Sequence, residues 1–241
     1  MLLRTIDDSH SKIDRIVLTS PNDSFAKTVA SRTGVDIGVL ADAIRHALGK
    51  EDVRRIKTSL GEIILQPIRG LHDLIIFGGG HVSKHLAQIA SIAGFSTTVI
   101  DDREEFADPA RFPGASHVLA SEYETVFSKI ELKPSTFIVI VTRGHQSDEL
   151  VLEKSVRTSA RYIGMIGSKR KVIATYKNLI ARGFTAIELK NVHAPIGLDI
   201  GAVTAEEIAV SIVAEMVRVR REFKAPSEPM AVQLEDWFKK S

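Results

Sequence analysis

A strand, a glycine turn and a helix follow one another without interruption in the middle of the chain. The apolar run Leu-Ile-Ile-Phe ends at Phe77, three glycines follow, and a helical pattern runs from about His81 to Gly94. A second apolar run ends at Asp101, which completes a β-α-β unit. This unit constrains the fold strongly, because two strands joined by such a helix favour a parallel sheet with helices packed on it.

The same alternation continues toward the end of the chain. Further strands are predicted at 117–119, 137–142 and 162–166, and helices at 147–159 and 168–182. A last helix is predicted from Thr204 to about Phe223, because Thr-Ala-Glu-Glu is a sequence typical of a capped helix start. We therefore predict an α/β fold, a Rossmann-like parallel sheet with helices on both faces.

The first seventy residues predict a separate, smaller unit. They contain a strand-like run at 12–19, a helix that begins near Asn22 or Asp23, a second helix at 35–48 and a strand at 62–67. We place the boundary after Gly70, which gives a small N-terminal α+β domain over 1–70 and a Rossmann-type ligand-binding domain over 71–241.

Composition narrows the classes of partner and site. The formal charge is +2 and no long block of like charge occurs, so neither nucleic acid nor a membrane is an expected partner. The N-terminus lacks the apolar core of a signal peptide, and the cytoplasm is the expected location. The chain has no Cys, which excludes thiolate metal sites and a persulfide carried by this chain. No metal site is predicted, because the histidines lack metal-ligand spacing.

The glycine turn predicts a site for a phosphate-bearing ligand. Gly78 suits a tight turn, and Gly80 lets the backbone approach a diphosphate at a helix start, where free N–H groups and the helix dipole favour an anion. Ser83 stands where a dinucleotide fingerprint has its third glycine. Asp101 is placed to accept a hydrogen bond from a ribose 2′-hydroxyl and to repel the extra phosphate of NADP. The alternative is that the glycines serve only geometry and Asp101 caps a loop.

Three further loops follow predicted strands or precede the last helix. Arg143 and His145 either contact a ligand or pair with an acid and cap a helix. The cations at 169–171 follow Ser168 in a first helical turn, where they oppose the helix dipole, which indicates either a bound anion or a solvated basic face. The glycine-containing loop at 193–201 either lines a site or serves as a structured connection.

Five ordered segments carry a family resemblance. They are IIFGGGHVSKHL, VIDDREEFA, VIVTRGHQSDELVL, YIGMIGSKRK and HAPIGLDIGAVTAEEIAVSIVAEM. Together they resemble the xanthine dehydrogenase accessory protein family, also called XdhC/CoxI, over its C-terminal Rossmann domain, from about Glu62 to Arg221. The first sixty residues lack the family's Gly-Ser-x-Pro segment and Ile-Gly-Gly-Gly turn, so the N-terminal domain is divergent or shortened.

The resemblance implies a non-catalytic maturation chaperone rather than an enzyme. Such a protein binds the molybdenum cofactor (molybdopterin), protects it, assists its sulfuration by a cysteine desulfurase and delivers it to a xanthine dehydrogenase-like molybdoenzyme. The candidate cofactor-binding residues, carried over by position, are Gly78, Gly79, Gly80, His81, Asp101, Arg143, His145, Gly167, Ser168, Lys169, Arg170, His193, Asp199 and Gly201.

Two other functions stay open on the residues alone. The Gly78 turn with Asp101 is also compatible with an NAD(P)-dependent oxidoreductase of unknown substrate, although no candidate proton donor is evident. A ligand-sensing interaction module is the third alternative. The apolar helix from Thr204 serves either the core or a dimer face, and we expect a homo-oligomer.

Overall fold

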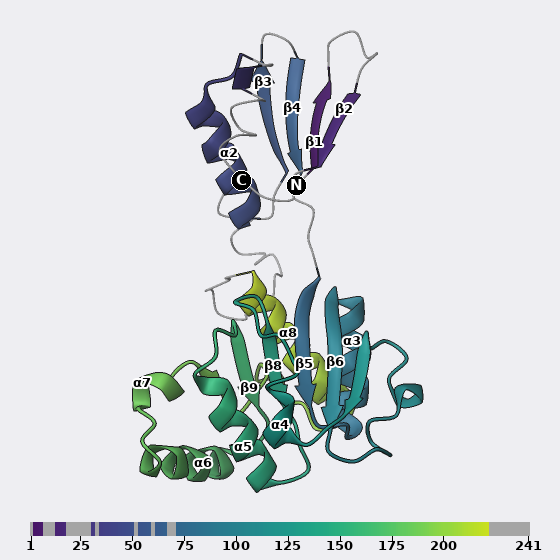
Figure 1. Cartoon of the computed structure of the whole chain (residues 1–241), viewed down its shortest axis with the longest axis vertical. Helices are drawn as coiled ribbons and strands as arrows, with labels where there is room; N and C mark the ends of the chain where they lie inside the picture. The colour runs from purple at the N-terminus through teal and green to yellow at the C-terminus, as the bar shows by residue number, and fades with distance from the viewer. Residues whose placement is uncertain are drawn as a thin grey trace, which may run out of the picture. The chain divides into compact units, whose positions relative to one another are not determined.

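The chain is divided into two compact units, Met1–Leu71 and His72–Ser241. The computed structural model describes residues 2–6, 13–17, 30–31, 34–50, 53–58, 61–66 and 71–221 (Figure 1). The two units are described separately below.

The N-terminal unit contains a four-stranded antiparallel sheet and one described long helix. Its elements are β1 (Leu2–Ile6), β2 (Ile13–Val17), α2 (Ile37–Lys50), β3 (Arg54–Thr58) and β4 (Gly61–Gln66). The strand order is β2-β1-β4-β3. Leu40 and Ile44 of α2 pack on Ile63 and Leu65 of β4, and all four are buried. Helix and sheet thus share one small apolar core.

The sequence predicted part of this unit. The strand at 12–19, the helix at 35–48 and the strand at 62–67 are confirmed as β2, α2 and β4, each within two residues at either end. The strands β1 and β3 were not predicted. The helix predicted to begin near Asn22 lies outside the described residues.

The second unit contains the Rossmann sheet. Its strands are β5 (His72–Phe77), β6 (Phe95–Asp101), β7 (His117–Ala120), β8 (Phe137–Ile140), β9 (Tyr162–Met165) and β10 (Val192–His193). Its helices are α3 (His81–Ile92), η1 (Pro109–Arg111), α4 (Tyr123–Val126), α5 (His145–Val156), α6 (Lys169–Ala181), α7 (Ala186–Leu189) and α8 (Ala205–Arg220). All strand pairs are parallel, in the order β10-β9-β8-β5-β6-β7. The predicted parallel sheet is confirmed.

The strand order indicates at which edge of this sheet a ligand is expected to bind. The chain runs from β5 outward to β6 and β7, then returns to the other side of β5 and continues through β8, β9 and β10. The order therefore reverses between β5 and β8. In open parallel sheets, ligands bind at the carboxyl ends of the strands beside such a reversal. We call this edge the carboxyl edge.

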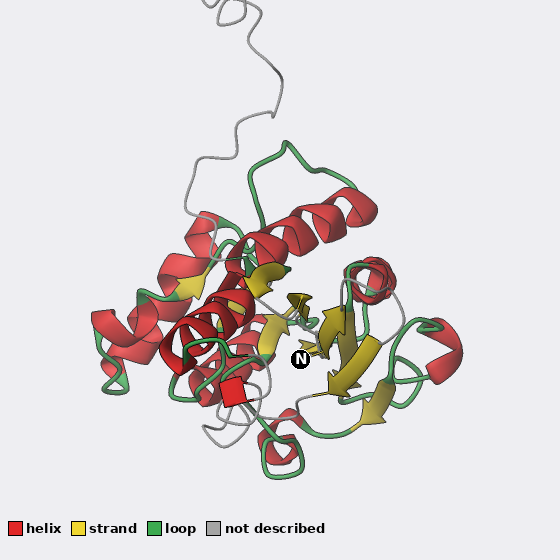
Figure 2. Cartoon of the chain, turned by 90° about the horizontal axis from the view of Figure 1, so that it is seen from above, coloured by secondary structure: helices red, strands yellow, loops and turns green. Residues whose placement is uncertain are grey.

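Helices cover both faces of the sheet, as predicted (Figure 1; Figure 2). Side chains alternate along a strand, so Leu74 and Ile76 of β5 face one layer, whereas Ile75 and Phe77 face the other. The first layer contains α3 and α8, and the second contains α4, α5, α6 and α7. Every residue of β8 is buried, which explains its uninterrupted apolar sequence.

The predicted start of the last helix is confirmed in detail. Thr204 caps α8: its hydroxyl accepts a hydrogen bond from the amide of Glu207 at 3.3 Å, and the Glu207 carboxylate accepts one from the Thr204 amide at 3.0 Å. This double cap fixes where the loop before α8 ends. No helix in the described ranges is long and apolar enough to cross a membrane.

Candidate functional site

The glycine turn lies at the carboxyl end of β5 and is packed tightly on two sides. Gly78 has a φ of 110°, and a Cβ atom there would lie 2.4 Å from the carbonyl oxygen of Val141. A Cβ at Gly79 would lie 2.3 Å from the carbonyl oxygen of Phe106. Both positions therefore require glycine.

Gly80 differs from the two glycines before it. It is the N-cap of α3 with ordinary dihedrals, φ −75° and ψ −168°, and no side chain caps the helix. A Cβ at this position would meet no atom within 4 Å. His81 follows as an exposed residue, and Ser83 is fully buried. The helix start thus presents free backbone N–H groups beside open space, which suits an anion.

Asp101 supports the turn from the end of β6. Its side chain is buried, and its oxygens accept hydrogen bonds from the amide of Gly79 at 2.6 Å and from the amide of Arg103 at 3.0 Å. The Arg103 guanidinium donates two more, at 2.9 and 3.1 Å. Burial raises the pKa of Asp101, but the hydrogen bonds from Arg103 and Gly79 outweigh it, and the net pKa lies below its usual value.

A second arginine holds the carbonyl group of Gly79, whose amide is bound by Asp101. Arg111, in η1, donates to the carbonyl oxygen of Gly79 at 3.1 Å and to that of Glu105 at 3.0 Å. The Phe106 ring has the Arg103 guanidinium carbon 3.5 Å from its centroid and that of Arg111 4.5 Å away. The side chains of Arg103, Phe106 and Arg111, in the segment after β6, therefore form a wall beside the glycine turn.

Two cationic loops follow β8 and β9 at the same edge. Arg143 is exposed, with its guanidinium 3.8 Å from a carboxylate oxygen of Asp102, and His145 is exposed in the first turn of α5. Ser168 caps α6, its hydroxyl accepting from the amide of Lys171. The next two side chains, Lys169 and Arg170, are exposed.

A buried ion pair joins these two loops. Asp148 of α5 is fully buried, accepts hydrogen bonds from the amide and hydroxyl of Thr142 at 3.0 and 2.6 Å, and pairs with the ammonium of Lys171. Burial raises the pKa of Asp148, and the hydrogen bonds from Lys171 and Thr142 offset this only in part. The pair fixes the loop after β8 to the start of α6.

Two cavities open at this edge and share Ser168. The first, of about 470 Å³, is lined by His145, Arg170 and Lys171 among others. The second, of about 590 Å³, lies between the start of α6 and the loop before α8. Its lining consists of Ile166, Gly167, Ser168, Lys169, Pro195, Ile196, Gly197, Leu198, Asp199, Ile200, Ala202, Ile208 and Ser211. The charged residues that line the first cavity are thus Arg170, Lys171 and Glu149, and the second cavity has an apolar wall with Lys169 and Asp199 as its charged residues.

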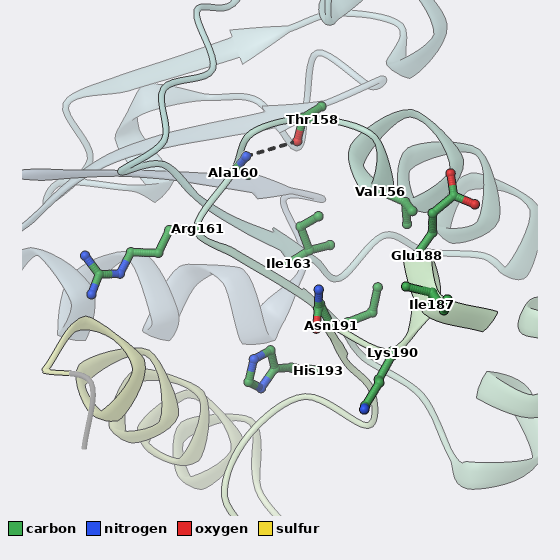
Figure 3. A pocket seen from close by; sticks show the side chains of 11 residues that line it. Val156, Thr158, Ala160, Arg161, Ile163, Ile187, Glu188, Lys190, Asn191 and His193 are labelled. Carbon is green, nitrogen blue, oxygen red and sulfur yellow. Dashed lines mark hydrogen bonds between the residues drawn. The ribbon is translucent and has the colours of Figure 1, made fainter. Parts of the chain in front are cut away.

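His193 lies elsewhere. It lines a third cavity, of about 630 Å³, with Arg161 and Lys190, and its ring lies on the side of the strands that faces α8 (Figure 3). Its Nδ1 atom is 3.1 Å from the carboxylate of Glu215, which also accepts from the Tyr162 hydroxyl at 2.7 Å. Burial raises the pKa of Glu215, but the hydrogen bonds from His193 and Tyr162 bring it below its usual value.

The predicted residues therefore fall into three groups. One is the glycine turn with Asp101, including Gly78, Gly79, Gly80 and His81. The second lines or flanks the two cavities that share Ser168, and contains Arg143, His145, Gly167, Ser168, Lys169, Arg170, Asp199 and Gly201. His193 stands alone at the third cavity. Among the described residues, no cluster of three His, Asp or Glu side chains is arranged to hold a metal ion.

Four residues whose side chains hold site residues in place were not predicted from the sequence. Arg103 and Arg111 hold Asp101 and Gly79, Asp148 holds Lys171, and Glu215 holds His193. Lys171 was noted only as one of three cations. An acid in the first turn of α5, three residues after His145, was the available signal for Asp148. The partners of the others depend on contacts distant in sequence or on how the loop after β6 folds.

Comparison with known proteins identifies relatives of this chain. A protein of Escherichia coli (strain K12) named "Uncharacterized protein YqeB" is 31% identical over 167 residues, which are 67% of this chain and 30% of that protein. A probable xanthine dehydrogenase subunit of Bacillus subtilis (strain 168) is 31% identical over 159 residues, 66% of this chain and 46% of that protein. The chain thus spans less than half the length of either relative.

A solved structure shares the fold. The crystal structure of a xanthine dehydrogenase from Bacillus halodurans superposes with a TM-score of 0.60 at 20% identity, over 95% of this chain and 94% of that chain. A family model described as the XdhC Rossmann domain matches residues 74–216, from β5 into α8, and so includes the glycine turn and both cationic loops. The chain therefore belongs to the XdhC family, as its five ordered segments indicated.

Proposed function

We propose that this chain binds the molybdenum cofactor at the carboxyl edge and delivers it to a xanthine dehydrogenase-like molybdoenzyme. The observation that carries the proposal is the pair of cavities that share Ser168, one with Arg170 and Lys171 in its lining and the other largely apolar with Lys169 in its lining. Family membership and the name of the Bacillus subtilis relative support the choice of client.

The residues present fit the chemistry of this cargo. Molybdopterin has a flat pterin and a phosphate, so it needs an apolar surface beside an anion site. Ile196, Leu198 and Ile208 supply apolar lining in the larger cavity. Lys169 and Arg170 supply charge, and neither makes an ion pair with a carboxylate in the described part of the chain. Cations without partners are available to the anionic groups of the cofactor.

The geometry favours this cargo over a nicotinamide dinucleotide. An NAD site needs a free acid at the end of β6 for the ribose 2′-hydroxyl, whereas Asp101 is buried and already accepts four hydrogen bonds from Gly79 and Arg103. An NAD-dependent oxidoreductase is therefore the weaker hypothesis.

The family resemblance and the composition support a role in sulfuration. The chain has no Cys, so it supplies no thiol for a persulfide. We propose that the sulfur comes from a partner cysteine desulfurase while the cofactor is held at the carboxyl edge. In this proposal the chain protects the cofactor during this step.

Reversing the charge of Arg170, which lines the first cavity, tests the proposal. Arg170→Glu is expected to weaken molybdopterin binding at least tenfold, since hydrogen bonds to charged groups contribute about 1.5–3 kcal/mol each. Activation of a cofactor-free xanthine dehydrogenase by the loaded chain should fall in parallel. The measurements are anaerobic fluorescence titration and recovery of xanthine oxidation.

Lys177→Glu is the matched control, because Lys177 is an exposed cation on the same helix and lines neither cavity. It makes the same change in net charge. Equal losses in the two variants would show that only net charge matters and would contradict a direct contact between Arg170 and the ligand. Failure of the loaded wild-type chain to activate the enzyme would contradict the delivery role.

A further inference from the structure

The end of β6 is where a Rossmann site reads the ribose of a nucleotide, and in this chain that position is already filled. A carboxylate has about four lone-pair sites for hydrogen bonds. Asp101 uses them for two backbone amides, of Gly79 and Arg103, and for two donors of the Arg103 guanidinium. A ribose hydroxyl would have to displace one of these donors.

Arg103 is itself held in place. Its side chain is 20% exposed, and its guanidinium lies 3.5 Å from the centroid of the Phe106 ring. Arg111 packs against the same ring from 4.5 Å and ties down the carbonyl of Gly79. An arginine that pairs bidentately with a carboxylate and stacks on an aromatic ring is held in position by both interactions. Displacement of Arg103 would break the stacking as well as the ion pair.

The other side of the glycine turn is open by comparison. Gly80 has free space around it, and the two cavities that share Ser168 lie on the β8 and β9 side of the sheet. A phosphate on the start of α3 therefore leaves room for the rest of the ligand toward α6 and α8. Toward β6 it meets the wall formed by Arg103, Phe106 and Arg111.

We propose that Arg103 is a specificity-determining residue that occupies the ribose position on Asp101 and excludes a second nucleoside from the carboxyl edge. Resting on the proposed function, this selects the form of molybdopterin that carries a single phosphate over the form extended by a nucleotide. The guanidinium takes the hydrogen bonds that a dinucleotide would need, and the stacked Phe106 keeps it there.

The test compares wild type with Arg103→Ala for three ligands: molybdopterin, its cytosine dinucleotide form and ADP-ribose. Between ligands, wild type should bind the dinucleotide form at least about threefold more weakly than molybdopterin. Between proteins, wild type should bind ADP-ribose at least about tenfold more weakly than Arg103→Ala does. In Arg103→Ala the dinucleotide form should gain about tenfold, because the freed carboxylate can accept from a ribose. Molybdopterin affinity should stay within about threefold of wild type.

Arg103→Lys provides a second variant if Arg103→Ala does not fold. Lysine keeps a positive charge beside Asp101 but lacks the two-pronged geometry, so part of the gain for ADP-ribose is expected. A wild type that binds the dinucleotide form as tightly as molybdopterin, or more tightly, would overturn the proposal, as would folded Arg103 variants that gain no affinity for ADP-ribose.

The ADP-ribose arm separates this inference from the proposed function. If neither cofactor form binds any protein, but ADP-ribose binds Arg103→Ala and not wild type, the molybdopterin role fails and the role of Arg103 stands. If molybdopterin binds wild type and ADP-ribose binds both proteins equally, the molybdopterin role stands and the role of Arg103 fails.

Discussion

Lys171→Met is expected to lower the free energy of unfolding by about 3–5 kcal/mol, the cost typical of leaving one partner of a buried ion pair behind. Lys171 pairs with Asp148, whose side chain has no exposed surface, while the lysine side chain is 14% exposed. Methionine retains much of the aliphatic stem of lysine. The loss therefore reports the charge and its hydrogen bond rather than a cavity.

The stability loss in Lys171→Met should depend on pH, and the pKa of Asp148 determines the direction of that dependence. Burial already raises the pKa of Asp148 with Lys171 present, and removal of the ammonium raises it further. A folded-state pKa above the unfolded value means that the folded state takes up a proton more readily as the pH falls. The Lys171→Met defect should therefore be smaller at about pH 5 than at about pH 7.5.

The double variant Asp148→Asn with Lys171→Met is the control. Asparagine keeps an acceptor for the amide and hydroxyl of Thr142 but has no charge to leave unpaired. We expect it to recover about half of the loss, measured by hydrogen exchange of peptides from β8 and α5 in urea. If the losses of the two single variants, Lys171→Met and Asp148→Asn, simply added in the double variant and did not depend on pH, a buried pair that bridges the two loops would be contradicted.

Gly78→Ala is expected to destabilise the Rossmann unit by at least about 3 kcal/mol, from strained dihedrals and from overpacking together. The φ of 110° disfavours any side chain, and the added Cβ would lie 2.4 Å from the Val141 carbonyl oxygen and 2.9 Å from the Thr142 Cα. Gly78 directly follows β5, and Val141 directly follows β8 and donates its amide to the Phe77 carbonyl oxygen at 2.9 Å, so these backbone segments have little freedom to move apart. Hydrogen exchange across β5 and β8 measures the effect.

Gly80→Asn is the matched control within the same turn. Gly80 has ordinary dihedrals, open space around its Cβ and the N-cap position of α3, where asparagine is favoured. Stability should stay within about 1 kcal/mol of wild type or rise. Similar losses in the two variants would contradict the separate roles assigned to Gly78 in geometry and to Gly80 in ligand access.

The order of elements could be predicted from local pattern because β-α-β units leave strong signals. The buried strands at β5 and β8 are continuous apolar runs, and Thr204 with Glu207 marks the start of α8. Three strands, β1, β3 and β10, were missed. β3 forms a strand by pairing with β4, which lies next along the chain. β10 has two residues, too few for any periodicity, and β1 exists by pairing with β2 and β4, which the local sequence does not encode.

The site was predictable in its loops but not in its contacts. Parallel strands bring their carboxyl ends to one edge, so the loops after β5, β8 and β9 could be placed together. The setting of His193 depends on register: it pairs with Gly164 on β9, and alternation along β10 turns its side chain toward α8 and Glu215. That register is a tertiary property. The role of Arg103 likewise depends on how the loop after β6 folds back.

Anaerobic calorimetry of molybdopterin binding to wild type, Gly80→Asn and Gly80→Asp tests most directly whether the carboxyl edge binds a phosphate at the start of α3. Both substitutions are favourable helix caps of nearly the same shape, and they differ by one negative charge. Wild type and Gly80→Asn should bind within about fivefold of each other, and Gly80→Asp at least about tenfold more weakly. Equal binding by Gly80→Asn and Gly80→Asp, or no binding by wild type, would contradict a phosphate site at this helix start.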